Sequence, residues 1–236
     1  MKAVILMGSP RKQGNTAALL TPFCEELEKH GVETETVWLY DKEIRPCVGC
    51  RACSVACKAL NEVPIGQFWN RVVRVGPNPE FEGADYPDVY MYFLPVTCQH
   101  CATPECTAVC PTGASVKTED GTVQIDKELC IGCGACLDAC PYGVRYINAD
   151  TNVAEKCTMC AHLIDKGEQP ACVRHCPGQA RLFGDLDDPE SAPSKMRASK
   201  KTPKLTDVGN HPGVDYGLDK FTWKGGEEPW QFSGLC

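Results

Sequence analysis

The chain carries its cysteines in four compact groups, and this arrangement constrains its fold more than any other feature of the sequence. Of the 18 cysteines in 236 residues, only Cys24 and Cys236 fall outside the groups. The groups are Cys47-x2-Cys50-x2-Cys53-x3-Cys57, Cys98-x2-Cys101-x4-Cys106-x3-Cys110, Cys130-x2-Cys133-x2-Cys136-x3-Cys140 and Cys157-x2-Cys160-x11-Cys172-x3-Cys176. Three of them end in Cys-Pro, whereas the first is followed by Lys58.

This spacing is typical of cysteines that bind iron–sulfur cubanes. In a C-x2-C-x2-C loop three thiolates face one cluster, while the fourth cysteine of the run ligates a different cluster. The groups therefore have to work in pairs, and their sixteen thiolates predict four 4Fe-4S clusters. Clusters held by so short a stretch of chain cannot lie far apart, which predicts electron transfer from one cluster to the next.

Zinc and disulfides are the two alternatives for so many cysteines. Structural zinc sites use pairs of C-x2-C, and they have no role for a third cysteine at the same spacing followed by x3-C-P. Disulfide-rich scaffolds are small secreted domains, whereas this chain is much longer and its cysteines are tightly grouped. Both alternatives are disfavoured by the spacing.

The charge balance and hydropathy of the chain exclude other classes of partner. It has 24 Lys and Arg against 31 Asp and Glu, for a formal charge of −7, and no basic run, so we expect no nucleic-acid binding. It also has no stretch of about 18 apolar residues, so we expect no direct membrane insertion. The N-terminus has neither a signal-peptide pattern nor a twin-arginine pair, which predicts no export signal of its own.

Several segments between Cys47 and Ser191 resemble the electron-transfer subunit of the molybdenum or tungsten bis-pterin oxidoreductases, the β-subunit type of dimethyl sulfoxide reductase. The segments are CRACSVACKALNEVP, TCQHCATPECTAVCPTGAS, CIGCGACLDACPYGVRYIN, KCTMCAHLIDKGEQPACVRHCP and FGDLDDPES. NVAEKCTMCAHLID is also similar to the small subunit of pyrogallol–phloroglucinol transhydroxylase, and GNHPGVDYGLDKFTWKG to subunits paired with catechol dehydroxylases.

The resemblance implies a pairing of the cysteine groups. Group 47–57 would pair with 157–176, and 98–110 with 130–140, as two pseudo-symmetric ferredoxin-like modules. One cluster would be held by Cys47, Cys50, Cys53 and Cys176, and its neighbour by Cys57, Cys157, Cys160 and Cys172. The other two would be held by Cys98, Cys101, Cys106 and Cys140, and by Cys110, Cys130, Cys133 and Cys136. In the family, the cluster of the first three cysteines lies nearest the pterin, so Cys47, Cys50 and Cys53 are the expected docking end.

The resemblance also implies what the chain works with. It predicts a non-catalytic electron-transfer subunit that serves a large molybdopterin partner, containing molybdenum or tungsten, in anaerobic respiration or reductive metabolism. A membrane anchor or quinol-oxidising subunit would be a further partner. Two compartments stay open: the cytoplasm, or the extracytoplasmic face of the membrane after co-export with a partner bearing a twin-arginine signal. The cysteine groups offer no open coordination site and no nucleophile–base pair, which agrees with a subunit that catalyses nothing alone.

Three parts of different character make up the chain. Residues 1–46 precede the cysteines, 47–184 hold them and include an insertion at 61–97 with two strand-like runs, and 185–236 form a Pro- and Gly-rich tail. The tail ends in aromatic residues such as Trp223 and Trp230, which favours an extended, partner-binding segment over a disordered one. Alternating segments at 114–129 and after the third group predict hairpins. The expected fold class is α+β: the two ferredoxin-like modules with an inserted small β-sheet.

The first 46 residues have a different pattern. KAVILM reads as a buried strand, residues 17–30 as an amphipathic helix closed by Gly31, and ETETVWLY as a second strand. The loop GSPRKQGNT resembles that of the flavodoxin-like NADPH-dependent FMN reductases, in which Ser9, Arg11, Asn15 and Thr16 would hold the FMN phosphate at a helix N-terminus. A complete flavodoxin-like sheet has five strands and only two precede the cysteines, so we predict a partial β-α-β unit without FMN.

Two other functions are kept as alternatives. The first is an iron–sulfur flavoprotein that takes electrons from NAD(P)H or ferredoxin through FMN bound at this loop. The second is a ferredoxin-like subunit of another assembly, such as a hydrogenase or a formate dehydrogenase.

Overall fold

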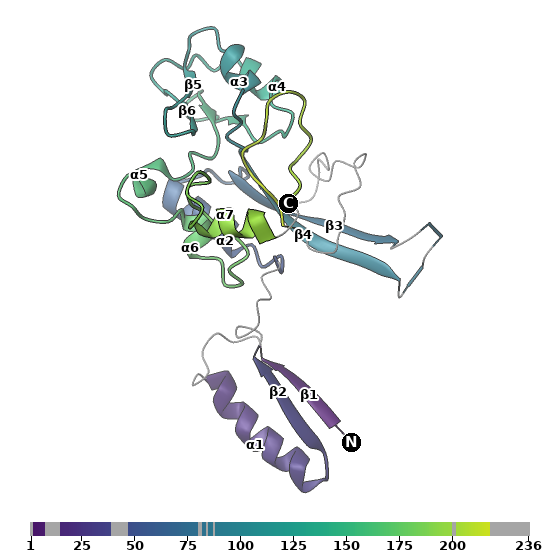
Figure 1. Cartoon of the computed structure of the whole chain (residues 1–236). Helices are drawn as coiled ribbons and strands as arrows, with labels where there is room; N and C mark the ends of the chain where they lie inside the picture. Colours follow the sequence, from purple (N-terminus) through teal and green to yellow (C-terminus); the bar gives the residue numbers. More distant parts are fainter. Residues whose placement is uncertain are drawn as a thin grey trace. The chain divides into compact units, whose positions relative to one another are not determined.

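The computed structural model describes residues 2–7, 15–38, 47–79, 82–83, 85–86, 88–199 and 202–217 (Figure 1). These residues divide into two compact units, Met1–Pro46 and Cys47–Cys236. Within the described ranges, no helix is both long enough and apolar enough to cross a membrane.

The first unit is a β-α-β unit, as predicted. Strand β1 (Lys2–Met7) pairs in parallel with β2 (Glu33–Trp38), and helix α1 (Asn15–Lys29) makes the connection that parallel strands require. Gly31 ends the helix with φ +74°, and its N–H donates to the Glu28 carbonyl at 3.0 Å. The helix begins two residues earlier than the sequence pattern predicts.

In the second unit, each cysteine group lies on or beside a short helix. The helices are α2 (Ala52–Asn61), α3 (Glu105–Ala108), α4 (Ala135–Asp138), α5 (Ala161–Ile164), α6 (Ala171–Arg174) and, outside the groups, α7 (Ala192–Ser199). Helix α2 of the first group packs on α6 of the fourth, and α3 of the second group packs on α4 of the third (Figure 1). The packing therefore brings together groups that are far apart in the sequence.

Three antiparallel hairpins connect the groups, and all three lie in segments where strands are predicted. They are β3 (Asn70–Pro79) with β4 (Val89–Thr97), β5 (Ser115–Lys117) with β6 (Val123–Ile125), and β7 (Tyr146–Ile147) with β8 (Ala154–Glu155). The first is the longest and forms the small sheet of the 61–97 insertion.

The hydrophobic core of the second unit consists of small clusters interleaved with cysteines. Leu94 and Val96 of β4 pack with Cys98, and Cys57 packs with Val63 and Trp69. Each of these apolar clusters is small and includes at least one cysteine of the four groups.

The C-terminal segment 202–217 joins this core. Leu205 is 1% exposed and Tyr216 is 7% exposed, and both belong to the cluster that contains Leu94 and Cys98. The segment, yellow in Figure 1, thus packs on its own chain. The aromatic residues Trp223 and Trp230, on which the prediction of a partner-binding tail rests, lie outside the described residues.

Candidate metal centre

The described part of the chain contains 17 cysteines, and all of them are free thiols. The disulfide alternative therefore finds no support among these residues. Sixteen of the 17 belong to the four groups, and the other is Cys24 on α1.

The first set of thiols comprises Cys47, Cys50, Cys53 and Cys176. Burial raises the pKa of Cys47, and the nearby thiols of Cys53, Cys176 and Cys50 raise it further. Cys50 is exposed, whereas Cys53 is buried on α2. The set thus combines three cysteines of the first group with one from the fourth.

The second set comprises Cys57, Cys157, Cys160 and Cys172. Burial raises the pKa of Cys57 to about 12, together with the charges of Cys172 and Cys160. The amide of Asn61, at the end of α2, lies 3.7 Å from the Cys57 sulfur and 3.9 Å from the Cys160 sulfur. This side chain can donate to either of two thiolates that belong to different groups.

The third set comprises Cys98, Cys101, Cys106 and Cys140. Burial raises the pKa of Cys101 and brings that of Cys106 to about 11, and Cys98 and Cys140 contribute to both shifts. Burial alone would raise the pKa of Cys98 as well, but the neighbouring Lys156 and His100 lower it to about 6.

The fourth set comprises Cys110, Cys130, Cys133 and Cys136, all of which line one pocket that opens to solvent. Backbone N–H groups point at two of these sulfurs: Ser115 donates to Cys110 and Ala154 to Cys130, each at 3.4 Å. Backbone donors of this kind stabilise thiolate ligands and tune the metal that they hold.

The geometry fits clusters better than single ions. Among the described residues, no three His, Cys, Asp or Glu side chains converge closely enough to hold one metal ion. Thiols of different groups nevertheless lie near one another, and N–H groups also point at Cys157 (from Met159, 3.4 Å) and Cys176 (from Ala180, 3.3 Å). A cubane presents a different iron atom to each of its four cysteines, so it spaces them more widely than one ion does.

Comparison with known proteins identifies the family. Models of 4Fe-4S dicluster domains match residues 46–114 and 89–186. The putative iron-sulfur subunit of dimethyl sulfoxide reductase from Halobacterium salinarum is 42% identical over 195 residues, which cover 72% of this chain and 74% of that protein. The chain is an iron–sulfur subunit of the dimethyl sulfoxide reductase family.

Other relatives of this iron–sulfur subunit serve related reductases. The thiosulfate reductase electron transfer subunit of Salmonella typhi is 47% identical over 155 residues (65% of this chain, 78% of that protein). A subunit of tetrathionate reductase from Salmonella typhimurium is 39% identical over 203 residues (84% and 78%). The prediction of an electron-transfer subunit of a reductase, not catalytic by itself, is confirmed.

The first residues of the iron–sulfur subunit match a second family. A model of NADPH-dependent FMN reductases covers residues 1–64 and overlaps the first dicluster match over residues 46–64. The predicted resemblance is therefore confirmed. Of the residues expected at an FMN phosphate, Ser9 and Arg11 lie outside the described residues, and Asn15 and Thr16 are the first residues of α1. The absence of FMN stays a prediction.

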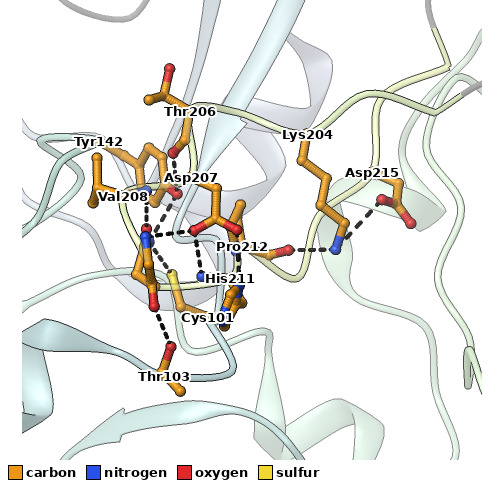
Figure 2. A network of polar contacts seen from close by, with 12 residues as sticks. Cys101, Thr103, Tyr142, Lys204, Thr206, Asp207, Val208, His211, Pro212 and Asp215 are labelled. Carbon is orange, nitrogen blue, oxygen red and sulfur yellow. Dashed lines mark hydrogen bonds and ion pairs between the residues drawn. The ribbon is translucent and has the colours of Figure 1, made fainter.

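One side chain of the C-terminal segment reaches the sulfur of a candidate ligand and could not be predicted from the sequence. The Asn210 amide donates to the Cys101 sulfur at 3.0 Å and to the Tyr142 hydroxyl at 2.9 Å. The Tyr142 hydroxyl in turn donates to the Thr206 carbonyl at 2.9 Å, as Figure 2 shows. Only the turn-forming run DVGNHPG hinted at a fixed loop here, because Asp207 can accept from the backbone that follows it.

Three buried or partly buried cations were also missed, namely Arg145, Lys156 and Arg181. Each lies one to five residues from a group cysteine in the sequence, but spacing alone does not separate such residues from ordinary surface cations. Their burial and their neighbours become visible only in the folded chain.

Proposed function

We propose that this subunit holds four 4Fe-4S clusters, one in each set of thiols, and relays electrons between a redox partner and the molybdopterin cofactor of a large catalytic subunit. The observation that carries the proposal is the composition of the sets. Each combines three cysteines of one group with one cysteine of another, which is the pattern expected when the fourth cysteine of a run ligates a different cubane from the first three. The pairing supports two pseudo-symmetric modules, one made of the first and fourth groups and one of the second and third.

The neighbours of the thiols support a linear order of the clusters. Cys53 of the first set acts on the pKa of Cys172 in the second, and Cys98 of the third set acts on that of Cys157 in the second. Arg145 interacts with Cys106 of the third set and Cys136 of the fourth. An electron would therefore pass through the sets in the order first, second, third, fourth, or the reverse.

The end that contains the first set is the proposed docking end for the catalytic partner. Cys50 is exposed, and the apolar side chains of Val48 and Val55 beside it are 61% and 66% exposed. Exposed apolar side chains around a cluster ligand suit a protein interface. The relatives include subunits of dimethyl sulfoxide, thiosulfate, tetrathionate and selenate reductases, so we place this chain in a complex of that kind.

Iron analysis of anaerobically purified protein tests the proposal. We expect about sixteen iron and sixteen sulfide atoms per chain, no bound flavin, and low-temperature EPR signals of interacting clusters after reduction. About eight iron atoms, or zinc in place of iron, would contradict it.

The match of residues 1–64 to FMN reductases favours one second candidate, an iron–sulfur flavoprotein. A flavin absorbance band together with NAD(P)H oxidation by the isolated chain would support this candidate. If both are absent at full iron content, the electron relay remains as the proposed function.

A further inference from the structure

We propose that three cations, Arg181, Lys156 and Arg145, each lie at a junction between two successive clusters. Each cation raises the reduction potentials of the two clusters beside it, so that electrons can pass between them. The inference rests on the proposed function, because the four anionic clusters are taken to be the counter-charges of these cations. The cation variants that test it leave every candidate cluster ligand unaltered.

Arg145 marks the junction between the third and fourth sets. It is 7% exposed and its Nη2 donates to the Cys106 sulfur of the third set at 2.8 Å. The guanidinium also interacts with the sulfur of Cys136, which belongs to the fourth set. Its Nη1 is buried and has no hydrogen-bond partner among the described residues. A guanidinium presents several donors in a fixed fork, so it can face two anionic groups at once.

Lys156 marks the junction between the second and third sets. It is 2% exposed, and its Nζ donates to the carbonyls of Val123 and Cys157, the latter at 2.8 Å. Its charge acts on Cys157 of the second set, and on Cys98 and Cys106 of the third. These two carbonyl oxygens accept two of its three N–H donors but leave its charge unbalanced.

Arg181 marks the junction between the first and second sets. It is partly buried, and its Nη1 donates to the Asn70 side-chain oxygen at 3.1 Å. Its electrostatic neighbours include Cys53 of the first set and Cys172 of the second. Asn70 is neutral and cannot balance the charge of the guanidinium. The negative charges near Arg181 are therefore the thiolates of two different sets.

None of the three cations has a carboxylate partner within the described residues, although exposed cations such as Lys127 and Arg174 do. An unpaired charge that is wholly or partly buried is costly, so a chain that keeps three of them has to balance them with another group. Clusters ligated by thiolates are anionic and become more so on reduction, and net charge is one of the factors that set their potentials. A cation between two of them stabilises an electron on either and weakens the repulsion between neighbours that are both reduced.

The test is a potentiometric titration of the purified complex, followed by EPR, in which signals are assigned with a separate series of one Cys→Ser variant per set. Arg181→Gln, Lys156→Met and Arg145→Gln are each expected to lower the potentials of the two flanking clusters and leave the remote ones unchanged. We expect at least a tenfold fall in the reduced-to-oxidised ratio at fixed ambient potential, which is 59 mV for a one-electron couple.

Two further variants separate charge from packing. Asn70→Asp is nearly isosteric and places a carboxylate against Arg181, so it should lower the potentials of the first and second clusters while the cation stays in place. Arg174→Gln is the matched control, because it removes a cation from α6, between Cys172 and Cys176, that is half-exposed and already paired with Glu168 at 2.9 Å. This control should leave the potentials nearly unchanged.

The outcomes distinguish the inference from the function on which it rests. Full iron content with unchanged potentials in the Gln and Met variants and in Asn70→Asp would overturn the inference and leave the relay intact. Equal shifts in all four clusters would overturn the assignment of one cation to one junction. Iron well below sixteen atoms in the unmodified protein would instead overturn the proposed function. If a neutral variant loses its clusters, Arg145→Lys and Asn70→Asp test the inference instead. Arg145→Lys must keep the potentials of the third and fourth clusters near their original values, and Asn70→Asp must lower those of the first and second.

Discussion

At the scale of single residues, the potential of a cluster depends on the few donors that reach its sulfurs. Asn210 is such a donor, and it comes from a loop more than a hundred residues away from Cys101 in the sequence. It is 1% exposed and is held in place by Tyr142, whose pKa is raised chiefly by burial. The Asn210 amide is thus directed at the sulfur by a buried partner.

Replacing Asn210 with Ala is expected to lower the potential of the third cluster. A hydrogen bond to a ligand sulfur stabilises the more negative, reduced state, and the variant removes it. EPR-monitored titration measures the shift. Asn210→Asp should lower the potential further, because a carboxylate accepts hydrogen bonds and repels the thiolate. An unchanged potential in both variants at full iron content would contradict the prediction.

The sequence yields the candidate metal ligands but not the residues that we propose to adjust the clusters. Cysteine spacing carries the chemistry of ligation directly, so all sixteen candidates could be named without a structure. Asn210, Arg145 and Lys156 are ordinary polar residues in the sequence, and their role depends on which sulfur the fold brings within reach. No local pattern contains that information.

At the scale of elements, the loops between cysteines are as constrained as the cysteines. Gly132 lies between Cys130 and Cys133 with φ +68°, and a Cβ placed there would lie 2.3 Å from the Asn152 carbonyl oxygen. Both the backbone conformation and the space around it therefore require glycine.

Gly132→Ala is expected to cause loss of the fourth cluster. The loop would have to move away from Asn152, which displaces the sulfurs on either side, so iron should fall from about sixteen to about twelve atoms per chain. Gly134→Ala is the control, since Gly134 has φ +80° but nothing within 4 Å of the new Cβ. Iron analysis measures the loss. Equal losses of iron in the two variants would mean that backbone strain at positive φ, and not the clash with Asn152, is responsible.

The β3–β4 hairpin is the main apolar element of the second unit. Leu94 on β4 is 1% exposed, and its replacement with Ala is expected to lower the free energy of unfolding by about 2–5 kcal/mol. Met91 on the same strand is 48% exposed, and Met91→Ala should change it by less than about 0.5 kcal/mol. Chemical denaturation of the holoprotein measures both, and similar losses would show that the buried face is not the source of the stability.

Hairpins and the β-α-β unit were predictable because period-2 alternation and turn residues act locally. The first cysteine group has a feature that such local patterns do not predict. Its helix α2 continues to Asn61, whereas the helices of the other groups have four residues. Lys58 therefore sits inside a helix, where proline would remove a hydrogen bond, and its Nζ donates to the carbonyls of Pro64 and Gln67 at 2.7 Å. The departure from Cys-Pro has a structural reason that the sequence did not reveal.

At the scale of the whole molecule, we expect the second unit to depend on its clusters for stability. Its apolar clusters are small, and three of its cations have no carboxylate partner among the described residues. Metal binding in such a domain is folding free energy.

Removing the iron by oxidation and chelation is expected to unfold the second unit. Each buried cation left without its counter-charge costs on the order of 3–5 kcal/mol, which is comparable to the whole stability of many domains. Limited proteolysis should then cut within residues 47–217, and circular dichroism should lose the signal of the hairpins. An apoprotein as resistant as the holoprotein would contradict this dependence.

The C-terminal segment that covers Cys101 has a consequence for how the protein is made. Leu205, Asn210 and Tyr216 leave the ribosome after every cysteine of the four groups. Until they emerge, the sulfur of Cys101 has no cover from them, and an assembly factor could reach it from that side. A cluster bound at Cys101 before these three residues are synthesised would be covered only once they fold against it.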